Sequence, residues 1–325
     1  MSSPGNFSVN TFTEAVNGKG RFTQISSGLV RRHKYWLHIG LFLLTTVTVT
    51  ACGAIFAENF AHNRPAVQIE RNWSLLSDGI SSWRWWLSGL PFSITLLAIL
   101  LAHEVGHYWA SVHYGLDVSL PYFLPFPSII GTLGAFIRIR SPIYSKRVLF
   151  DVGIAGPLAG FALVMPALII GLLYSKVIPG IERQGDLIFA TPALFRLAEH
   201  LIFPGVSPQD IALHPISRAA WVGIFTTALN LLPIGQLDGG HILYAALPQY
   251  HRWLSRVFVV ALLPLGFLYW PWLLWAAFLF FFGMKHPAIY DDSELGPVRR
   301  KLCWLVILIF ILCFMLAPIE TTDTL

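Results

Sequence analysis

The chain has 325 residues, of which 55% are hydrophobic, 12% are charged and only three are cysteines. Soluble proteins carry about 25% charged residues, so this composition excludes an ordinary soluble domain and indicates a polytopic membrane protein. The net charge of +5 is spread among loops rather than gathered in one basic face, which argues against a nucleic-acid partner.

Residues 1–34 are polar, and we expect them to form a cytoplasmic N-terminal segment rather than a cleavable signal. From residue 35 onward, long apolar runs predict an all-α polytopic membrane domain at 35–318 with about six to seven transmembrane helices, followed by a tail at 319–325. The predicted spans lie near residues 35–57, 85–113, 149–174, 218–235, 254–270, 271–285 and 302–318. The fifth and sixth are short and meet at Tyr269–Trp272, where the pattern fits either a tight turn or one broken re-entrant segment.

Lys and Arg are unevenly distributed between the two sides that these spans would separate. With the N-terminus inside, fifteen of them fall on the inner side and seven on the outer side, which predicts a cytoplasmic N-terminus. The N-terminus lacks the features of a transit peptide, so we expect a prokaryotic plasma membrane. Tryptophans close to the predicted span ends are expected to anchor the chain at the interfaces, namely Trp83, Trp85, Trp86, Trp270, Trp272 and Trp275.

His103-Glu104-Val105-Gly106-His107 is the most informative motif, because it lies inside the second predicted span. An HExxH sequence on a helix places two imidazoles on one face, where both can bind one zinc ion, with a carboxylate aimed at the open position of the metal. The alternative is a polar pair that only hydrogen-bonds between helices. That alternative would leave three ionisable side chains seeking partners in hydrocarbon, so function is favoured.

Two histidines and a water leave a tetrahedral zinc one ligand short, and Asp238 is the candidate for the third. Counted from Arg84 and Arg218, at the outer ends of the second and fourth spans, His103 and Asp238 fall at similar depths. Pro233 and Gly235 should unwind the end of the fourth span. The alternative for Asp238 is a turn or helix cap before a helix that begins near His241.

The HEVGH box in one span, followed by Asn230-Leu-Leu-Pro-Ile-Gly-Gln-Leu-Asp238-Gly-Gly in a later one, resembles the site-2 proteases, which are intramembrane zinc metalloproteases. Gly153-Ile-Ala-Gly-Pro-Leu-Ala-Gly160 is also typical of that family. The predicted outer loop near 175–217 is too short for a PDZ domain, so the chain is similar to simple prokaryotic members without one.

The resemblance implies one zinc ion per chain, held by His103, His107 and Asp238, with Glu104 as the general base for peptide hydrolysis. It further implies that Asn230 lies near the substrate backbone, although an interhelix contact is the alternative. We leave His113 and His241 out of the metal set. The expected substrates are transmembrane proteins or peptides within a lipid bilayer, and the pattern specifies no oligomeric state.

Between the two boxes, Phe136-Ile-Arg-Ile-Arg140 alternates apolar and basic residues and predicts a short strand. Its exposed edge, with Gly134 as a candidate contact, could bind an unwound substrate by strand addition. A loop at the membrane surface is the equally weighted alternative. The strand hypothesis predicts that proline within 133–137 reduces cleavage while zinc stays bound.

Two other classes of function remain open at this stage. One is a metal-dependent membrane enzyme of different chemistry, which would need more histidines and carboxylates than the two boxes provide. The other is a non-catalytic relative that binds membrane proteins, against which the intact Glu104 argues.

Overall fold

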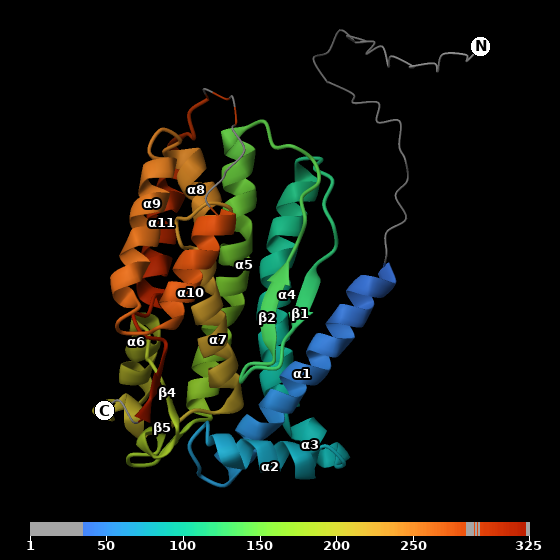
Figure 1. Cartoon of the computed structure of the whole chain (residues 1–325), viewed down its shortest axis with the longest axis vertical. Coiled ribbons are helices and arrows are strands. Elements are labelled where there is room, and N and C mark those ends of the chain that lie inside the picture. Colours follow the sequence, from blue (N-terminus) through green and yellow to red (C-terminus); the bar gives the residue numbers. More distant parts are fainter. Residues whose placement is uncertain (1–34, 284–288, 290, 292, 323–325) are drawn as a thin grey trace, which may run out of the picture. The chain divides into compact units, whose positions relative to one another are not determined.

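Helices make up most of residues 35–283, 289, 291 and 293–322, which are the residues that the computed structural model describes (Figure 1). The expected cytoplasmic segment at 1–34 lies outside these residues, as do the last three positions of the predicted tail. Contacts group Trp36–Leu325 into one unit, and the following paragraphs concern this unit.

The α-helices are α1 Tyr35–Ala61, α2 Ile69–Gly79, α3 Trp83–Ser88, α4 Leu90–His113, α5 Lys146–Leu173, α6 Ala193–Ile202, α7 Pro215–Asn230, α8 Asp238–Ala246, α9 His251–Leu265, α10 Pro271–Phe278 and α11 Pro297–Cys313. Shorter helical segments are the 3-10 turns η1 Glu182–Gln184 and η2 Pro208–Asp210 and the π-helical η3 Leu279–Gly283. The strands are β1 Tyr122–Pro125, β2 Thr132–Phe136, β3 Lys176–Val177, β4 Leu187–Phe189, β5 Ile211–Ala212 and β6 Ile319–Thr321. They pair as β1–β2, β3–β5 and β4–β6, all antiparallel. The chain is therefore mostly helical, as predicted, with two small sheets that the sequence did not indicate.

Three of the described helices, α1, α4 and α5, are long and apolar enough to cross a membrane. About 20 helical residues span the hydrocarbon core, whereas α7, α9 and α11 have 16, 15 and 17 residues. The count of six to seven spans therefore stays a prediction. The second span begins at Leu90 instead of residue 85, because Gly89 and Pro91 start a new helix after the short α3.

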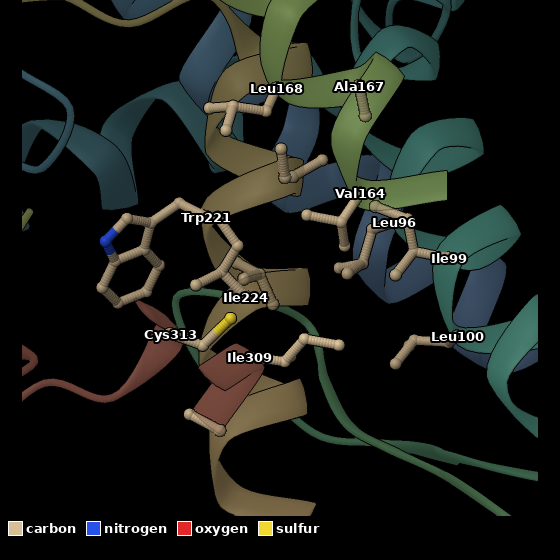
Figure 2. Packing of buried hydrophobic residues seen from close by; sticks show 14 of the residues in the cluster. Leu96, Ile99, Leu100, Val164, Ala167, Leu168, Trp221, Ile224, Ile309 and Cys313 are labelled. Atoms are coloured by element: carbon tan, nitrogen blue, oxygen red, sulfur yellow. The ribbon is translucent and has the colours of Figure 1, made fainter. Parts of the chain in front are cut away.

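The core forms where α4, α5 and α7 pack against one another, with α11 packed against α7. Figure 2 shows Leu96 and Ile99 of α4 facing Val164 of α5, with Ile224 of α7 between them and Ile309 of α11. Close approach of α7 requires Gly223, since a Cβ there would lie 2.9 Å from Val164 and 3.0 Å from Ile99. This tight contact holds α4 against α7, the two helices that carry the first box and the start of the second.

The strand after α4 begins earlier than the sequence indicated. The continuous ladder covers Thr132–Phe136, and of the predicted strand at 136–140 only Phe136 belongs to it, with an isolated bridge from Ile139 to Val118. The alternation of apolar and basic residues misplaced the strand because the register is set by β1, through pairs such as Phe123 with Ala135. The hairpin of β1 and β2 lies alongside α4 (Figure 1).

Helix α1 contacts this hairpin from the other side through polar groups. The Thr48 hydroxyl donates to the Gly131 carbonyl at 2.6 Å, and the Cys52 thiol donates to the Ser128 carbonyl at 3.2 Å. His38 hydrogen-bonds the Pro121 carbonyl at 3.1 Å. Non-helical backbone can lie at membrane depth only where protein encloses it, and α1 and α4 provide that enclosure.

The fourth predicted span ends at Asn230, and residues 231–237 form an irregular turn in which Gly235 has a φ of +53°. The unwinding expected from Pro233 and Gly235 is thus confirmed. Helix α8 starts at Asp238 rather than near His241, and Leu237 is its N-cap. The depth comparison for Asp238 is therefore only approximate, because the chain is not helical between Asn230 and Asp238.

A turn at Tyr269–Trp272 separates α9 from α10, and the two helices pack together, an arrangement that fits both alternatives. Two of the expected interfacial tryptophans are instead core residues. Trp272 is buried and donates to the Leu316 carbonyl at 2.6 Å. Trp85 is buried against Gly79, where a Cβ would lie 2.5 Å from the indole.

Candidate metal centre

Three potential metal ligands from two helices converge in a buried position. His103 and His107 lie one turn apart on α4, and their Nε2 atoms are 3.1 Å apart. The Asp238 Oδ2 atom at the start of α8 is 3.1 Å from His103 Nε2 and 3.3 Å from His107 Nε2. These three residues form the group of potential metal ligands found among the described residues.

The spacing of these atoms matches the dimensions of a zinc site. Zinc bonds of about 2.0–2.1 Å in a tetrahedron place neighbouring ligand atoms about 3.3 Å apart, close to the three distances observed here. Two carboxylates, Asp238 and Glu104, would balance the double positive charge of the ion in a site where water is scarce. The donor set therefore fits zinc in both geometry and charge.

The orientation of His107 is fixed by the neighbouring helix. Its Nδ1 hydrogen-bonds the Val152 carbonyl on α5 at 2.7 Å. A carbonyl can only accept, so Nδ1 carries the proton and Nε2 is free to donate its lone pair to a metal. Sequence reasoning did not find Val152, because a backbone carbonyl leaves no signal in the residue type.

Two glycines of α5 make room for the two imidazoles. A Cβ at Gly156 would lie 2.1 Å from His107 Nε2, and a Cβ at Gly160 would lie 3.2 Å from His103 Cβ. Glycines four residues apart on α5 therefore face histidines four residues apart on α4, with Gly156 against His107 and Gly160 against His103. These glycines of the Gly153–Gly160 segment thus serve helix packing, and their packing partners are the candidate ligands themselves. A nearby close approach involves Gly106, where a Cβ would lie 2.4 Å from the Ala155 carbonyl oxygen.

Glu104 is buried beside the ligands and lines a cavity of about 50 Å³. One water needs about 10–15 Å³ of such space, so the cavity can hold a few water molecules. The backbone of Ile137, which follows β2, interacts with the Glu104 carboxylate. The end of the hairpin thus lies beside the candidate base.

The two candidate substrate-binding residues lie at the same cavity. The Asn230 side-chain nitrogen at the end of α7 is 3.2 Å from His103 Nε2. Gly134 of β2 has a φ of +105°, and a Cβ there would meet no atom within 4 Å. The structure therefore brings together all six residues singled out from the sequence. His113 lies exposed at the end of α4, and neither it nor His241 belongs to the ligand group.

Comparisons with known proteins agree with this geometry. The sequence profile of Peptidase family M50 matches residues 91–269, more than half of the chain. The chain is 32% identical over 244 residues to "Probable zinc metalloprotease EGY1, chloroplastic" of Oryza sativa subsp. japonica, covering 71% of this chain and 41% of the relative. It is 28% identical over 237 residues to the Arabidopsis thaliana protein of the same name, covering 69% and 42%. It is also 30% identical over 201 residues to "Probable zinc metalloprotease EGY2, chloroplastic" of Arabidopsis thaliana, covering 57% and 33%.

The chain spans about two fifths of the length of the EGY1 relatives. The matched region contains both boxes and the glycines between them, which are the segments that build the candidate metal centre. The resemblance to the site-2 proteases expected from these boxes is thereby confirmed, and the chain belongs to Peptidase family M50.

Proposed function

We propose that this protein is an intramembrane zinc metalloprotease that hydrolyses peptide bonds in or next to the transmembrane segments of membrane-protein substrates. The observation that carries the proposal is the convergence of His103, His107 and Asp238 beside Glu104, at helices that are apolar enough to lie in a membrane. Membership of a peptidase family supports the same reaction.

Each residue of the centre has a proposed role. His103, His107 and Asp238 hold the ion, and the Val152 carbonyl keeps His107 in the tautomer that can do so. Bound zinc supplies a Lewis acid that activates water and polarises the scissile carbonyl. Glu104 accepts the proton of the attacking water and delivers it to the leaving amine. The cavity beside Glu104 admits the water that this step consumes.

The substrate is proposed to bind as an extended strand along β2. Helical peptide bonds are protected by their own hydrogen bonds, so a substrate helix must unwind before it is cut. Among the described strands β2 pairs with β1 alone, and Leu133 and Gly134 line the cavity that contains Glu104. An added strand at this edge would bring its backbone to Glu104 and Asn230.

The membrane location is integral and multi-pass, with residues 35–318 as the catalytic domain. We propose that residues 1–34 are cytoplasmic, since the Lys and Arg distribution favours this side. A prokaryotic plasma membrane remains our proposal for the compartment. The similar plant proteins are named as chloroplastic, which describes those proteins.

Cleavage of a panel of single-span substrates by purified protein in lipid tests the activity. The wild type is expected to cut within or next to the span, and a chelator should abolish cutting. Glu104→Gln should retain one zinc per chain and lose turnover by several orders of magnitude, whereas Asp238→Ala should lose zinc itself. Turnover by Glu104→Gln at the wild-type rate would refute the assigned mechanism. Bound iron in place of zinc would favour the enzyme of different chemistry.

Proline in β2 tests strand addition separately from metal chemistry. Leu133→Pro removes a backbone donor from the strand, and Leu133→Ala is the matched control that keeps it. We expect cleavage to fall at least tenfold in the proline variant alone, with zinc content unchanged in both. Equal cleavage by the two variants would rule out binding at this edge.

A further inference from the structure

The segment between α1 and α4 carries an apolar surface that the metal centre does not use. Helix α2 has no buried residue, and its side chains Ile69 and Trp73 are exposed, Trp73 by 69% of its surface. Ile80, directly after the helix, is exposed as well. Trp83 and Leu87 of α3 are exposed as well, Trp83 by 67%. We call these five side chains the α2–α3 apolar stripe. A soluble loop of 28 residues would not present two tryptophans to water in this way.

One face of α2 is held by the rest of the protein. The Asn59 side-chain amide of α1 donates to the Asn72 side-chain oxygen at 3.0 Å. Seven residues further, Gly79 is covered by the Trp85 indole. At the helix start, the Ile69 amide donates to the Asp186 carboxylate at 2.7 Å. Because residues seven apart share one helix face, Asn72 and Gly79 define the protein-facing side.

The apolar stripe lies a quarter turn or so from this protein-facing side. Trp73 and Ile80 each follow a protein-facing residue by one position, which rotates them by about 100° around the helix. Ser74 and Asp78 lie on the remaining side of the helix, about 100–140° from Trp73, and both are exposed. Helix α2 therefore has separate protein-facing, apolar and polar sides. A helix lying in the membrane interface beside a bundle needs these three sides.

The position of the segment in the fold indicates what covers the stripe. It connects the end of α1 to the start of α4, and both helices are long and apolar enough to cross the membrane. The connection must therefore lie at a membrane–water boundary. Figure 1 shows α2 running across the direction of the long helices at the end where α1 stops and α4 begins. Tryptophan is enriched at this depth because its ring is apolar and its N–H is polar.

We propose that α2 and α3 form an interfacial anchor whose apolar stripe inserts among phospholipid acyl chains near the head groups. Residues 62–89 carry three Arg and two acidic residues, so their charge is nearly balanced. Insertion therefore depends on the apolar side chains and not on anionic lipid. This surface is at the opposite end of α4 from the HExxH box and does not depend on the proposed proteolysis.

A photo-crosslinking residue at two positions of one helix tests the anchor. The full chain is prepared with p-benzoylphenylalanine in place of Trp73 or, as the matched polar-side control, in place of Ser74, which is exposed and lies about 100° from Trp73 around the helix. Each protein is placed in phosphatidylcholine vesicles, with and without added phosphatidylglycerol, and in its native membrane, and then irradiated. We expect a phospholipid adduct at position 73 in all three settings and at least fivefold less at position 74.

Three results would overturn the proposal: no lipid adduct at position 73, equal adducts at both positions, or a protein crosslink at position 73 in the native membrane. The third would mean that another protein covers the stripe. If the substitutions prevent folding, the unmodified chain in vesicles of a phospholipid with a diazirine on its acyl chain decides the question. Labelling within residues 69–87 must then fall on the stripe and spare Ser74 and Asp78.

Discussion

At the scale of single residues, Gly156 and Gly160 of α5 decide whether the metal centre can form. Each imidazole of the HExxH box occupies space that a side chain on α5 would otherwise fill. Protein interiors are closely packed, so neither imidazole ring can easily move away from a side chain added on α5.

Gly156→Ala is expected to weaken zinc binding by about 10- to 100-fold, the range found when groups that orient a ligand are altered. The added methyl would overlap His107 Nε2 at 2.1 Å, whereas Gly160→Ala meets its nearest atom at 3.2 Å and should have a smaller effect. Zinc affinity of both variants is measured by competition with a chelator. Equal affinities for the two variants would show that the glycines serve general helix packing only.

Glu199 on α6 is a buried carboxyl with one oxygen that has no hydrogen-bond partner among the described residues. Burial, and to a lesser degree the charge of Glu182, raises the pKa of Glu199 to about 7, although Arg196 opposes the shift. Glu182 itself is paired with Arg218 at 2.5 Å, so that arginine is already engaged. The ordinary pKa of a Glu is 4.5, so the folded state retains a proton that the unfolded state releases.

The free energy of unfolding should therefore fall as the pH rises from about 4.5 through about 7, by up to about 3 kcal/mol from this group. Glu199→Gln removes this contribution, so the variant should equal the wild type near pH 4.5 and be more stable than it at pH 8. Melting temperatures in detergent between these pH values measure the difference. Parallel curves for the two proteins would contradict the assignment.

At the scale of elements, the β1–β2 hairpin lies between the helix that carries the base and the first long helix. Its end at Ile137 lies beside Glu104, and it is hydrogen-bonded to α1 through Thr48, Cys52 and His38. Gly131 allows the closest approach, because a Cβ there would lie 2.7 Å from the Thr48 carbonyl oxygen. A shift of α1 would therefore move the hairpin, and with it the edge of β2 at the cavity.

Thr48→Val is expected to lower cleavage about fivefold without loss of zinc, because one hydrogen bond contributes about 1 kcal/mol. The valine keeps the shape of the side chain and removes its donation to Gly131. Thr46→Val is the matched control, since its hydroxyl bonds only to Phe42 within the same helix. Initial rates and zinc content are measured for both. A similar loss of rate in the control would mean that the effect arises from α1 alone.

At the scale of the whole molecule, the pairing of β4 with β6 restricts the membrane topology. Strand β6 near the C-terminus lies against β4 in the segment between α5 and α7, so both must be on one side of the membrane. An even number of crossings must then separate α5 from β6. With α1, α4 and α5 as three crossings, the total is odd, which favours seven over six.

The start of α1 and the C-terminal strand are accordingly expected on opposite sides, with α1 starting in the cytoplasm. Reporter fusions that are active only outside the cytoplasm should be active after residue 322 and within residues 175–217, and inactive between α8 and α9. Reporter activity in the fusion between α8 and α9 would exclude the proposed orientation. The prediction depends on β-sheet pairing and on the distribution of basic residues, which are independent observations.

The metal ligands and the apolar helices could be predicted from the sequence because they depend on local spacing. An HExxH box places its histidines one turn apart in any helix, and a long apolar run predicts a span without knowledge of its neighbours. The same local logic misplaced β2, since the register of a strand is set by its partner. Local spacing does not place Asp238, because the irregular turn at 231–237 returns the chain to the histidines.

Only the tertiary structure decided which groups from different elements meet. That Val152 orients His107, that Gly156 and Gly160 face the two imidazoles, and that α2 has an apolar side distinct from its protein-facing side are all results of packing. Such contacts depend on the separation and rotation of helices, which many distant residues set together. A sequence on its own specifies the period of each helix, whereas the face that each helix presents to its neighbour is settled only when the helices pack.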